Sequence, residues 1–466
     1  MTDLVIRNGT VVREDGVDRM DVAVTGGRIS AIGRGLSGAR TIDADGLIVL
    51  PGGVDNHCHI EQPVTKNGAS ADTFATATAS AAVGGTTSIV CFARQAEGET
   101  LARTVEAYRE KASRSVVDHA FHVMIIDPRP EVLADELPAV VADGARSIKI
   151  FTAYDGQMLP DPQILDVLAV AKRTGAMVAV HAENHAAIKF RLAELLAAGR
   201  TDAFAHAESR PGIVEAEAVR RMITLSETAG HPVHLFHVTC DLAAEEIRRA
   251  RARGVRVYSE TCTHYLALTE DVLKGPMAEV AGFVCSPPMR PEADRRAVWR
   301  HLIEGTLDMV SSDHSSFRMD DPMGKLKTGP DTPFDKVANG MPGLATRLPV
   351  LFDMAVSAGR IGLERFARLT ATNPAKLYGL YPRKGAVAVG ADADLALWDP
   401  TKTVTLRGAD LVSRAGYTPY EGRTVTGWPV LVLSRGDVVA RDGRPEGAEG
   451  RGEYLPRGAY AWPELH

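Results

Sequence analysis

Strand-length apolar runs alternate with amphipathic stretches over most of this 466-residue chain, and this alternation constrains the fold more than any other feature. One run, 233–237, precedes a helical pattern over 242–253 in which Leu242 and Ile247 alternate with charged residues. Alternating strands and helices imply a parallel sheet. The apolar runs lie at 87–90, 122–126, 147–151, 177–180, 233–237, 255–258 and 309–312.

Together with Val54, these runs give about eight strands, which is the strand count of a (β/α)8 barrel of the TIM type. An open, doubly wound parallel sheet is the alternative. No G-x-G-x-x-G motif follows any of the runs, and the pair Gly84-Gly85 is typical of an ordinary turn. We therefore expect a barrel of the α/β class.

Both ends of the chain consist of short β-branched runs joined by turns. Asn8-Gly9 separates two such runs near the start, and Arg435-Gly436 does so near the end. Turn pairs between β-branched runs are typical of hairpins. Neither end suffices for a domain, so we expect the two to pack together as a small β-sandwich beside the barrel. The expected boundaries are 1–50 with 385–440 for the sandwich, 51–384 for the barrel, and 441–466 for a tail over the barrel or against a neighbouring subunit.

The composition excludes several classes of protein. The net charge of -6 is spread without long like-charge blocks, so nothing indicates a nucleic-acid-binding surface. No segment reaches the roughly 20 apolar residues of a membrane span, and the start lacks the pattern of a signal peptide. The five cysteines form no close pairs, which favours buried reduced thiols. We expect a cytoplasmic protein.

Side chains that bind metals stand where the apolar runs end. His57 and His59 are two residues apart, so in a strand they face the same side and could bind one cation. His181 and His237 each follow another run, and Asp313 follows the last one. A polar strand end explains one His-x-His pair equally well, and a core histidine is the usual explanation for either of the others. Their recurrence favours a metal site, in which Asp313 could also accept a proton.

Lys149 lies between Ile148 and Ile150 on an apolar run, so it faces inward if the isoleucines face the helices. A buried ammonium is costly, and it has only donors, so the unmodified side chain cannot bind a metal. Either a carboxylate pairs with it, or burial lowers its pKa and leaves a reactive amine. Carbon dioxide adds to such an amine and forms a carbamate able to bridge two cations. A lysine that snorkels at a strand end is the simpler alternative.

At these motifs the chain resembles the amidohydrolase superfamily, within its cyclic-amidase branch of dihydropyrimidinases and hydantoinases. The resemblance runs through almost the whole chain and implies the fold described above. The matching segments are 51–55 with His57-x-His59, 149–154, 181–184, 237–239, 260–262, 285–290, Asp313-His314, Asn339-Gly340 and 347–349.

The resemblance implies a binuclear site and a mechanism. One cation would be bound by His57, His59 and Asp313, a second by His181 and His237, and carboxylated Lys149 would bridge both. A hydroxide that also bridges the cations would attack the ring amide, while Asp313 carries the proton to the leaving nitrogen. Tyr154 would donate to the developing oxyanion, and main-chain groups at Ser286 and Asn339 would hold the ring. A loop aromatic without a role is the alternative for Tyr154. Zinc suits these ligands first, with manganese, cobalt or nickel as alternatives.

Several departures bear on the substrate, which we expect to be a small cyclic amide. Glu61 stands where dihydroorotases have an arginine for the substrate carboxylate, so a ring that itself carries a carboxylate is disfavoured. Allantoinases usually lack the tyrosine seen as Tyr154. The loop 62–68 differs from that of many hydantoinases, which leaves the ring substituent open. The segment 318–330 could be a lid, although a solvated excursion is favoured.

Three alternatives to a hydantoinase or dihydropyrimidinase remain. Two are enzymes, an allantoinase-like hydrolase and a hydrolase of cyclic imides. The third is a metal-free assembly protein of the same fold, which is disfavoured because every ligand position is filled. The family resemblance also implies a homo-oligomer, a tetramer or a dimer.

Overall fold

The protein is described by a computed structural model that covers residues 2–64, 68–458, 460 and 462–465. Part of the expected substituent loop, residues 65–67, and tail residues 459, 461 and 466 lie outside the described residues. No helix among the described residues combines the length and the hydropathy that a membrane crossing requires.

A parallel sheet forms the body of the molecule, and its strands follow one another in chain order. The last strand is split in two. Its first half, β13, pairs with β12, and its second half, β14, pairs with β6, so the sheet closes into a barrel. The strands are β6 (Gly53–His59), β7 (Thr86–Arg94), β8 (Asp118–Met124), β9 (Ser147–Phe151), β10 (Met177–His181), β11 (Val233–Leu235), β12 (Val257–Cys262), β13 (Met309–Ser311) and β14 (His314–Ser315).

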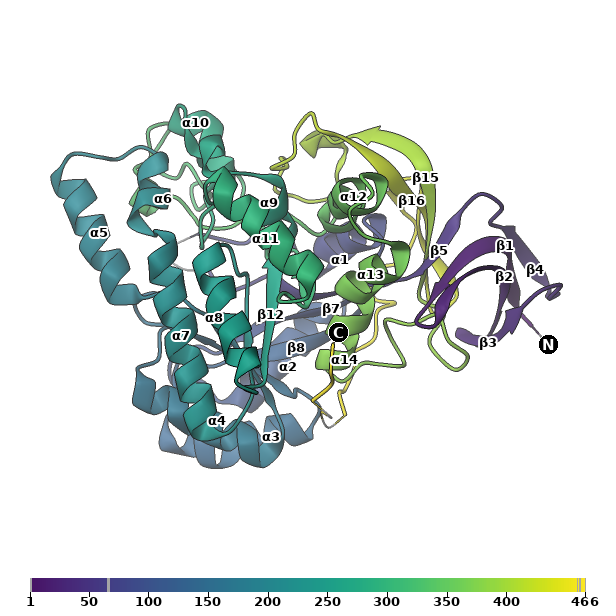
Figure 1. The fold of residues 1–466 in the computed structure, drawn as a ribbon, viewed down its shortest axis with the longest axis horizontal. Helices are drawn as coiled ribbons and strands as arrows, with labels where there is room; N and C mark the ends of the chain where they lie inside the picture. Colours follow the sequence, from purple (N-terminus) through teal and green to yellow (C-terminus); the bar gives the residue numbers. More distant parts are fainter. Residues whose placement is uncertain (1, 65–67, 459, 461, 466) are drawn as a thin grey trace.

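Helices cover the outside of this barrel, as Figure 1 shows for the side with α4, α7 and α8. They follow the strands along the chain, which confirms the strand–helix alternation expected from the sequence. The helices are α1 (Phe74–Val83), α2 (Leu101–Ala112), α3 (Leu137–Ala142), α4 (Asp161–Thr174), α5 (His185–Ala197), α6 (Phe204–Ser209), α7 (Gly212–Ala229), α8 (Asp241–Ala252), α9 (Thr263–Ala267), α10 (Met277–Val280), α11 (Glu292–Glu304), α12 (Arg347–Phe352), α13 (Leu363–Ala367) and α14 (Asn373–Leu377).

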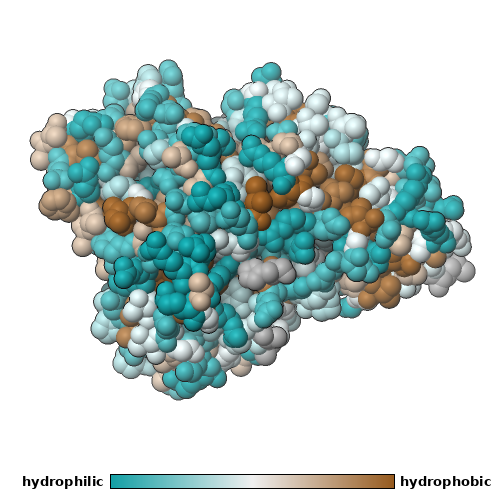
Figure 2. Space-filling view, in the orientation of Figure 1, coloured by the Kyte–Doolittle hydropathy of each residue, from teal (hydrophilic) through white to brown (hydrophobic). Residues whose placement is uncertain are grey.

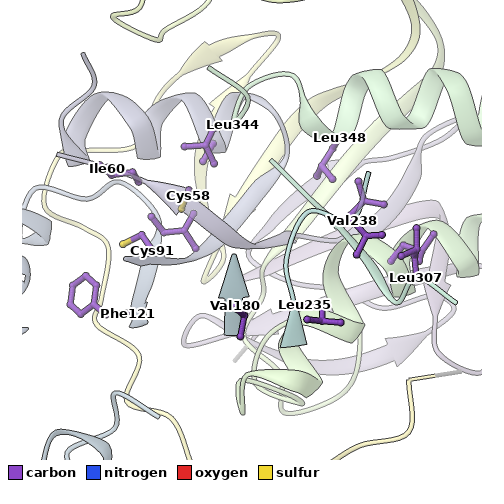
Figure 3. Close-up of a cluster of buried hydrophobic side chains, with 14 of the residues drawn as sticks. Cys58, Ile60, Cys91, Phe121, Val180, Leu235, Val238, Leu307, Leu344 and Leu348 are labelled. Carbon is purple, nitrogen blue, oxygen red and sulfur yellow. The ribbon is translucent and has the colours of Figure 1, made fainter. Parts of the chain in front are cut away.

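The main hydrophobic core lies between the strands and these helices. Alternate strand residues face outward into it, among them Cys58, Ile148 and Ile150. Figure 3 shows part of this core, where Cys58 and Cys91 lie near Ile60 and Leu344. Because neighbours on a strand face opposite sides, His57, His59 and Lys149 face the barrel interior. All five cysteines are buried and free, as expected.

The strands from both ends of the chain form a second, mixed sheet, seen to the right of the barrel in Figure 1. The two ends meet where β5 pairs antiparallel with β15. This sheet has a core of its own, to which Ile6, Val22 and Leu395 contribute. The expected β domain built from both termini is therefore confirmed. Its strands are β1 (Leu4–Arg13), β2 (Gly16–Thr25), β3 (Arg28–Gly33), β4 (Arg40–Asp43), β5 (Ile48–Pro51), β15 (Leu395–Thr405), β16 (Thr424–Ser434), β17 (Asp437–Arg441) and β18 (Arg444–Pro445).

The C-terminal tail runs across the amino-terminal end of the barrel of its own chain. Arg457 donates to the hydroxyl of Ser147 and to the carbonyl of Phe121, at strands β9 and β8. Leu455 and Leu465 pack there with residues at the starts of other barrel strands. The tail therefore closes the end of the barrel opposite the histidines.

The surface in Figure 2 is mostly polar, and the apolar residues on this face lie in separate small groups. Ile213 on α7 and Leu242 on α8 are among the exposed apolar side chains. Scattered apolar residues of this kind are normal on a folded domain.

A fully buried arginine joins the first and last barrel strands. Arg347 Nη1 donates to the carbonyl oxygens of Val54 on β6 (3.0 Å) and Val310 on β13 (3.1 Å). Its Nη2 donates to Thr86 at the start of β7, and Nε lies 3.5 Å from the Asp55 carboxylate. One planar group thus satisfies several buried acceptors at the point where the barrel closes.

We expect Arg347→Met to destabilise the fold by about 3–5 kcal/mol, because it leaves the Asp55 charge and several buried carbonyls without a partner. Thermal and urea unfolding of the metal-free protein measure this change. Arg423→Met is the matched control, since Arg423 pairs with Asp353 near the surface and its loss should cost about 1 kcal/mol or less. Equal losses in the two variants would contradict a special role for Arg347.

Candidate metal centre and active site

All the site residues expected from the sequence line one cavity at the carboxyl-terminal end of the barrel strands. This is the end at which barrel enzymes carry their active sites. The cavity also receives side chains that the sequence did not single out, including Arg94, Met124 and Gln157. The expected residues that line it are His57, His59, Lys149, Tyr154, His181, His237, Ser286, Asp313 and Asn339.

His57, His59 and Asp313 form a cluster that could hold a metal ion. Asp313 Oδ1 lies 3.0 Å from His57 Nε2 and 3.5 Å from His59 Nε2. One ligand atom from each residue lies within 4.8 Å of the other two. Asp313 lies between β13 and β14, two residues after β13 ends, and β14 pairs with the histidine-bearing end of β6. Closure of the barrel therefore assembles this cluster.

The carboxylate of Glu260 fixes the orientation of the His57 imidazole by binding its Nδ1. The carboxylate is fully buried on β12, and it accepts hydrogen bonds from His57 Nδ1 and Asn56 Nδ2. With Nδ1 protonated and bound to Glu260, Nε2 is left free to face Asp313. A carboxylate in this position raises the basicity of a metal-binding imidazole. Sequence reasoning assigned no role to Glu260, although a carboxylate on a buried strand was the available signal.

His181 and His237 form a second group beside the first. Their ring centroids are 4.6 Å apart, and the His237 ring lies 5.3 Å from that of His57. Burial lowers the pKa of both side chains, which favours the neutral imidazole that binds metals. His181 Nε2 is 2.8 Å from the carboxylate of buried Glu183, which also pairs with Arg210. In each group, one histidine thus contacts a buried carboxylate: Glu260 contacts His57, and Glu183 contacts His181.

Lys149 lies in the same cavity, and its amine has no hydrogen bond or ion pair with any other described residue. The side chain is 1% exposed, and its Nζ lies 4.2, 4.7 and 5.3 Å from the ring centroids of Phe236, Phe151 and Phe92. Ring faces stabilise an ammonium by about 0.5–2 kcal/mol, whereas burying a charge costs several. Burial accordingly lowers the pKa of Lys149 to about 7. Of the two solutions open to a buried lysine, pairing with a carboxylate is absent among the described residues.

Three cavity residues have a backbone conformation that non-glycine residues rarely adopt. The φ angles are +77° at Tyr154, +40° at His237 and +44° at Asp313. Each residue comes just after a barrel strand, where the chain leaves the sheet and turns. Such strain costs about 1–3 kcal/mol and persists only where the surrounding structure enforces it. Its concentration here marks this end of the barrel as a functional site.

The opposite wall of the cavity offers polar groups to a ligand. Asn339 Oδ1 is buried and has no hydrogen-bond partner among the described residues. Tyr154 and Ser286 lie on the same wall, and burial raises the pKa of the Tyr154 phenol, so it remains a donor at neutral pH. A buried acceptor without a partner costs about 1–3 kcal/mol unless a ligand satisfies it. The wall therefore suits a ligand with an N–H group.

The segment 318–330 is mostly exposed or partly exposed, as expected of a solvated excursion, but one buried lysine anchors it. Lys325 is fully buried, and its Nζ donates to the carbonyl oxygens of Val284 (2.8 Å) and Ala338 (3.0 Å). These carbonyls lie next to the segments that carry Ser286 and Asn339. The excursion is thus anchored by one lysine that joins the two ligand-facing segments.

Comparisons with known proteins bear on the family to which the chain belongs. The model of the amidohydrolase family matches residues 48–439. A D-hydantoinase of Ralstonia pickettii is 42% identical over 461 residues, covering 98% of this chain and 99% of the relative. A D-hydantoinase of Geobacillus stearothermophilus is 40% identical, covering 99% of this chain and 97% of the relative.

Solved structures give the same result for the fold. The crystal structure of dihydropyrimidinase from Brevibacillus agri NCHU1002 matches with a TM-score of 0.95 and 39% identity, covering 99% of this chain and 100% of the other. A structure of D-hydantoinase matches with a TM-score of 0.95 and 42% identity, covering 98% and 99%. With relatives this similar along its whole length, the chain belongs to the amidohydrolase family.

Proposed function

We propose that this protein is a metal-dependent hydrolase that opens the amide bond of a cyclic ureide ring, a hydantoin or a dihydropyrimidine. The observation that carries this proposal is Lys149, a buried lysine that lies in one cavity with four histidines and an aspartate and has no ion-pair partner in the described part of the chain. The full-length relatives named as D-hydantoinases and a dihydropyrimidinase support the choice of ring.

The residues of the cavity fit a pair of divalent cations. His57, His59 and Asp313 would hold one, and His181 and His237 the other. A carbamate on Lys149 would serve as the shared anionic ligand, because it turns a donor-only amine into an oxygen ligand. Imidazole and carboxylate ligands suit zinc, manganese, cobalt or nickel, and we propose zinc. The carboxylates of Glu260 and Glu183 behind the histidines are the outer partners that such ligands require.

Bound cations would lower the pKa of water and polarise the ring carbonyl. Asp313 then accepts the proton of the attacking water and returns it to the ring nitrogen as the carbon–nitrogen bond breaks. Water is consumed: one of its protons is carried by Asp313 to the ring nitrogen and the other is released to solvent, so the ring opens to a carboxylate and a neutral ureido group. The Asp313 side chain suits this role, because it is 12% exposed and faces the cavity beside both histidines.

The polar wall would position the ring for this reaction. The Tyr154 hydroxyl donates to the carbonyl oxygen as negative charge develops on it. The unpaired Oδ1 of Asn339 accepts from a ring N–H, and main-chain groups at Ser286 and Asn339 hold the amide edges. Lys325 keeps the two segments at a fixed separation through the carbonyls of Val284 and Ala338.

A substrate panel tests the ring directly. The zinc-loaded protein is assayed with dihydrouracil, substituted hydantoins, allantoin and succinimide. We expect turnover of hydantoins or dihydrouracil, whereas preferred turnover of allantoin or succinimide would establish one of the alternatives expected from the sequence. A folded protein that binds no metal and opens no ring would indicate an assembly protein.

The cytoplasmic location and the homo-oligomer, a tetramer or a dimer, stay predictions.

The role of Glu260 behind His57 can be tested by substitution. Glu260→Gln should lower metal affinity about 10- to 100-fold, because it weakens the hydrogen bond that orients His57. Competition titration with a chromogenic chelator measures the affinity. Glu217→Gln on α7 is the control, since Glu217 accepts from Asn184 outside the cavity. Unchanged affinity in Glu260→Gln would show that the carboxylate does not support a metal ligand.

Lys149→Ala should lose both activity and bound metal, because the shared anionic ligand is gone. Short-chain carboxylic acids should restore part of the activity by occupying the vacated space. Lys172→Ala, which removes an exposed lysine on α4, should change neither property. Full activity in Lys149→Ala would refute the proposed carbamate.

The carbamate also has a test independent of turnover. With a pKa of about 7, the free amine of Lys149 is abundant above pH 7 and scarce below it. Uptake of isotope-labelled bicarbonate by the protein, followed by NMR, should therefore rise as the pH increases through 7. Label taken up equally by Lys149→Ala would place the carbamate elsewhere.

Tyr154→Phe should lower kcat about 100- to 1,000-fold while metal content stays unchanged, because one donor to the oxyanion is lost. Steady-state kinetics and metal analysis of the same preparation separate the two effects. Tyr108→Phe is the control, since this buried hydroxyl on α2 lies outside the cavity. A parallel loss of metal and activity in Tyr154→Phe would mean that the tyrosine is structural.

A further inference from the structure

Arg94 brings a positive charge into the cavity, and the described residues supply no ion-pair partner for it. It is the last residue of β7, it is half-buried, and it lines the cavity together with His59 and Met124. Its guanidinium has no hydrogen bond or ion pair with any described residue. Arginine keeps its charge at any physiological pH, so unlike Lys149 it cannot escape by losing a proton.

The strand geometry places Arg94 above the candidate metal centre. Phe92 faces the barrel interior, with its ring 4.5 Å from that of His59 and 5.1 Å from that of His57. Residues two apart on a strand face the same side, about 7 Å further along. Arg94 is therefore on the same side as Phe92 but nearer the cavity mouth. Its partner in the sheet register, Met124, also lines the cavity.

The acidic groups near this end of the cavity are already engaged. Asp313 is the carboxylate among the described lining residues, and it contacts His57 and His59. Glu61 turns away from the cavity. Its carboxylate lies 2.9 Å from Arg114 and accepts from the backbone N–H of Phe74 at the start of α1. The guanidinium of Arg94 thus faces the cavity without a counter-charge from the described part of the chain.

We propose that Arg94 determines specificity by binding a carboxylate on the side chain of the substrate ring, an inference that rests on the proposed function. The ring amide is held between the metal centre and the wall of Ser286 and Asn339, so a substituent on the ring can extend toward β7. A guanidinium binds a carboxylate through two parallel hydrogen bonds. The substrate class is then a hydantoin with a carboxymethyl or carboxyethyl group, opened to an N-carbamoyl derivative of an acidic amino acid.

A carboxylate on a side chain of the ring is compatible with the expectation, drawn from Glu61, that the ring itself carries no carboxylate. That exclusion concerns a carboxylate attached directly to the ring, which would need a cation beside His59. Arg94 lies at the end of β7, the strand next to that of His59, where we propose that it meets a carboxylate on a short side chain. Glu61 in turn is occupied by its pairing with Arg114 and by the N–H of Phe74.

The decisive experiment compares two hydantoins of the same shape and different charge. One carries a carboxyethyl group and the other the neutral carbamoylethyl group. For the zinc-loaded wild type we expect kcat/KM to favour the carboxylate by roughly 10- to 100-fold, the worth of hydrogen bonds between charged groups. In Arg94→Met this ratio should approach one, with the change mainly in KM, and Arg94→Lys should retain part of it.

Arg114→Met is the matched control, because it removes an arginine that is paired outside the cavity. It should keep the wild-type ratio. Melting curves of each variant show whether it is folded, and because the ratio compares two substrates of one preparation, a partial loss of active protein does not affect it. Equal kcat/KM for the two hydantoins in the wild type, or an unchanged preference in Arg94→Met, would overturn the proposal.

A binding measurement separates this inference from the proposed function. Calorimetry of the zinc-loaded protein with N-carbamoylglutamate and N-carbamoylglutamine requires no turnover. We expect the carboxylate to bind more tightly in the wild type and in Arg114→Met, but not in Arg94→Met. A wild type that opens unsubstituted hydantoin but shows no carboxylate preference in either assay refutes the role of Arg94 alone. A wild type that opens no ring refutes the proposed function, and calorimetry still decides on Arg94.

Discussion

The site depends on how the barrel closes. The last strand is divided, so that β13 completes the sheet against β12 while β14 pairs with β6, and Asp313 stands between the two halves. Arg347 holds the joint by bonding to the carbonyls of Val54 and Val310. Because His57 and His59 lie at the end of β6, this one closure brings them to Asp313. The left-handed backbone of Asp313 is the local consequence of dividing a strand at the point where a ligand is needed.

Several buried charges of this protein are held in ion pairs. Glu183 pairs with Arg210, Glu215 with Arg290, and Lys384 with carboxylates at the junction between barrel and mixed sheet. Removing one partner from such a pair costs about 3–5 kcal/mol, so pairing is the expected state of a buried charge. Against that background, an unpaired cationic side chain inside a cavity is a sign of a ligand or a chemical modification.

Much of this structure could be predicted from the sequence. The alternating apolar runs gave the barrel, and the two isoleucines beside Lys149 gave its inward orientation, because both depend on the local periodicity of the chain. The residues that sequence reasoning missed depend on long-range pairing. Glu260 lies about 200 positions from His57, and whether Arg94 or Lys325 has a partner is decided by segments far away in the chain. Local patterns contain no information about such contacts, so the anchoring of 318–330 through Lys325 could not be predicted.

Lys149 and Arg94 differ in whether the cation can lose its proton, and this difference decides what each side chain can do in the cavity. Both face the cavity without a carboxylate partner among the described residues. The lysine can lose its proton, and burial brings its pKa to about 7, so it can become a nucleophile toward carbon dioxide and end as an anion among the metal ligands. The arginine has no such route and stays positive. Its charge can be neutralised only by an anion that arrives from outside, and in a cavity built to hold a neutral ring that anion belongs on the ring's side chain.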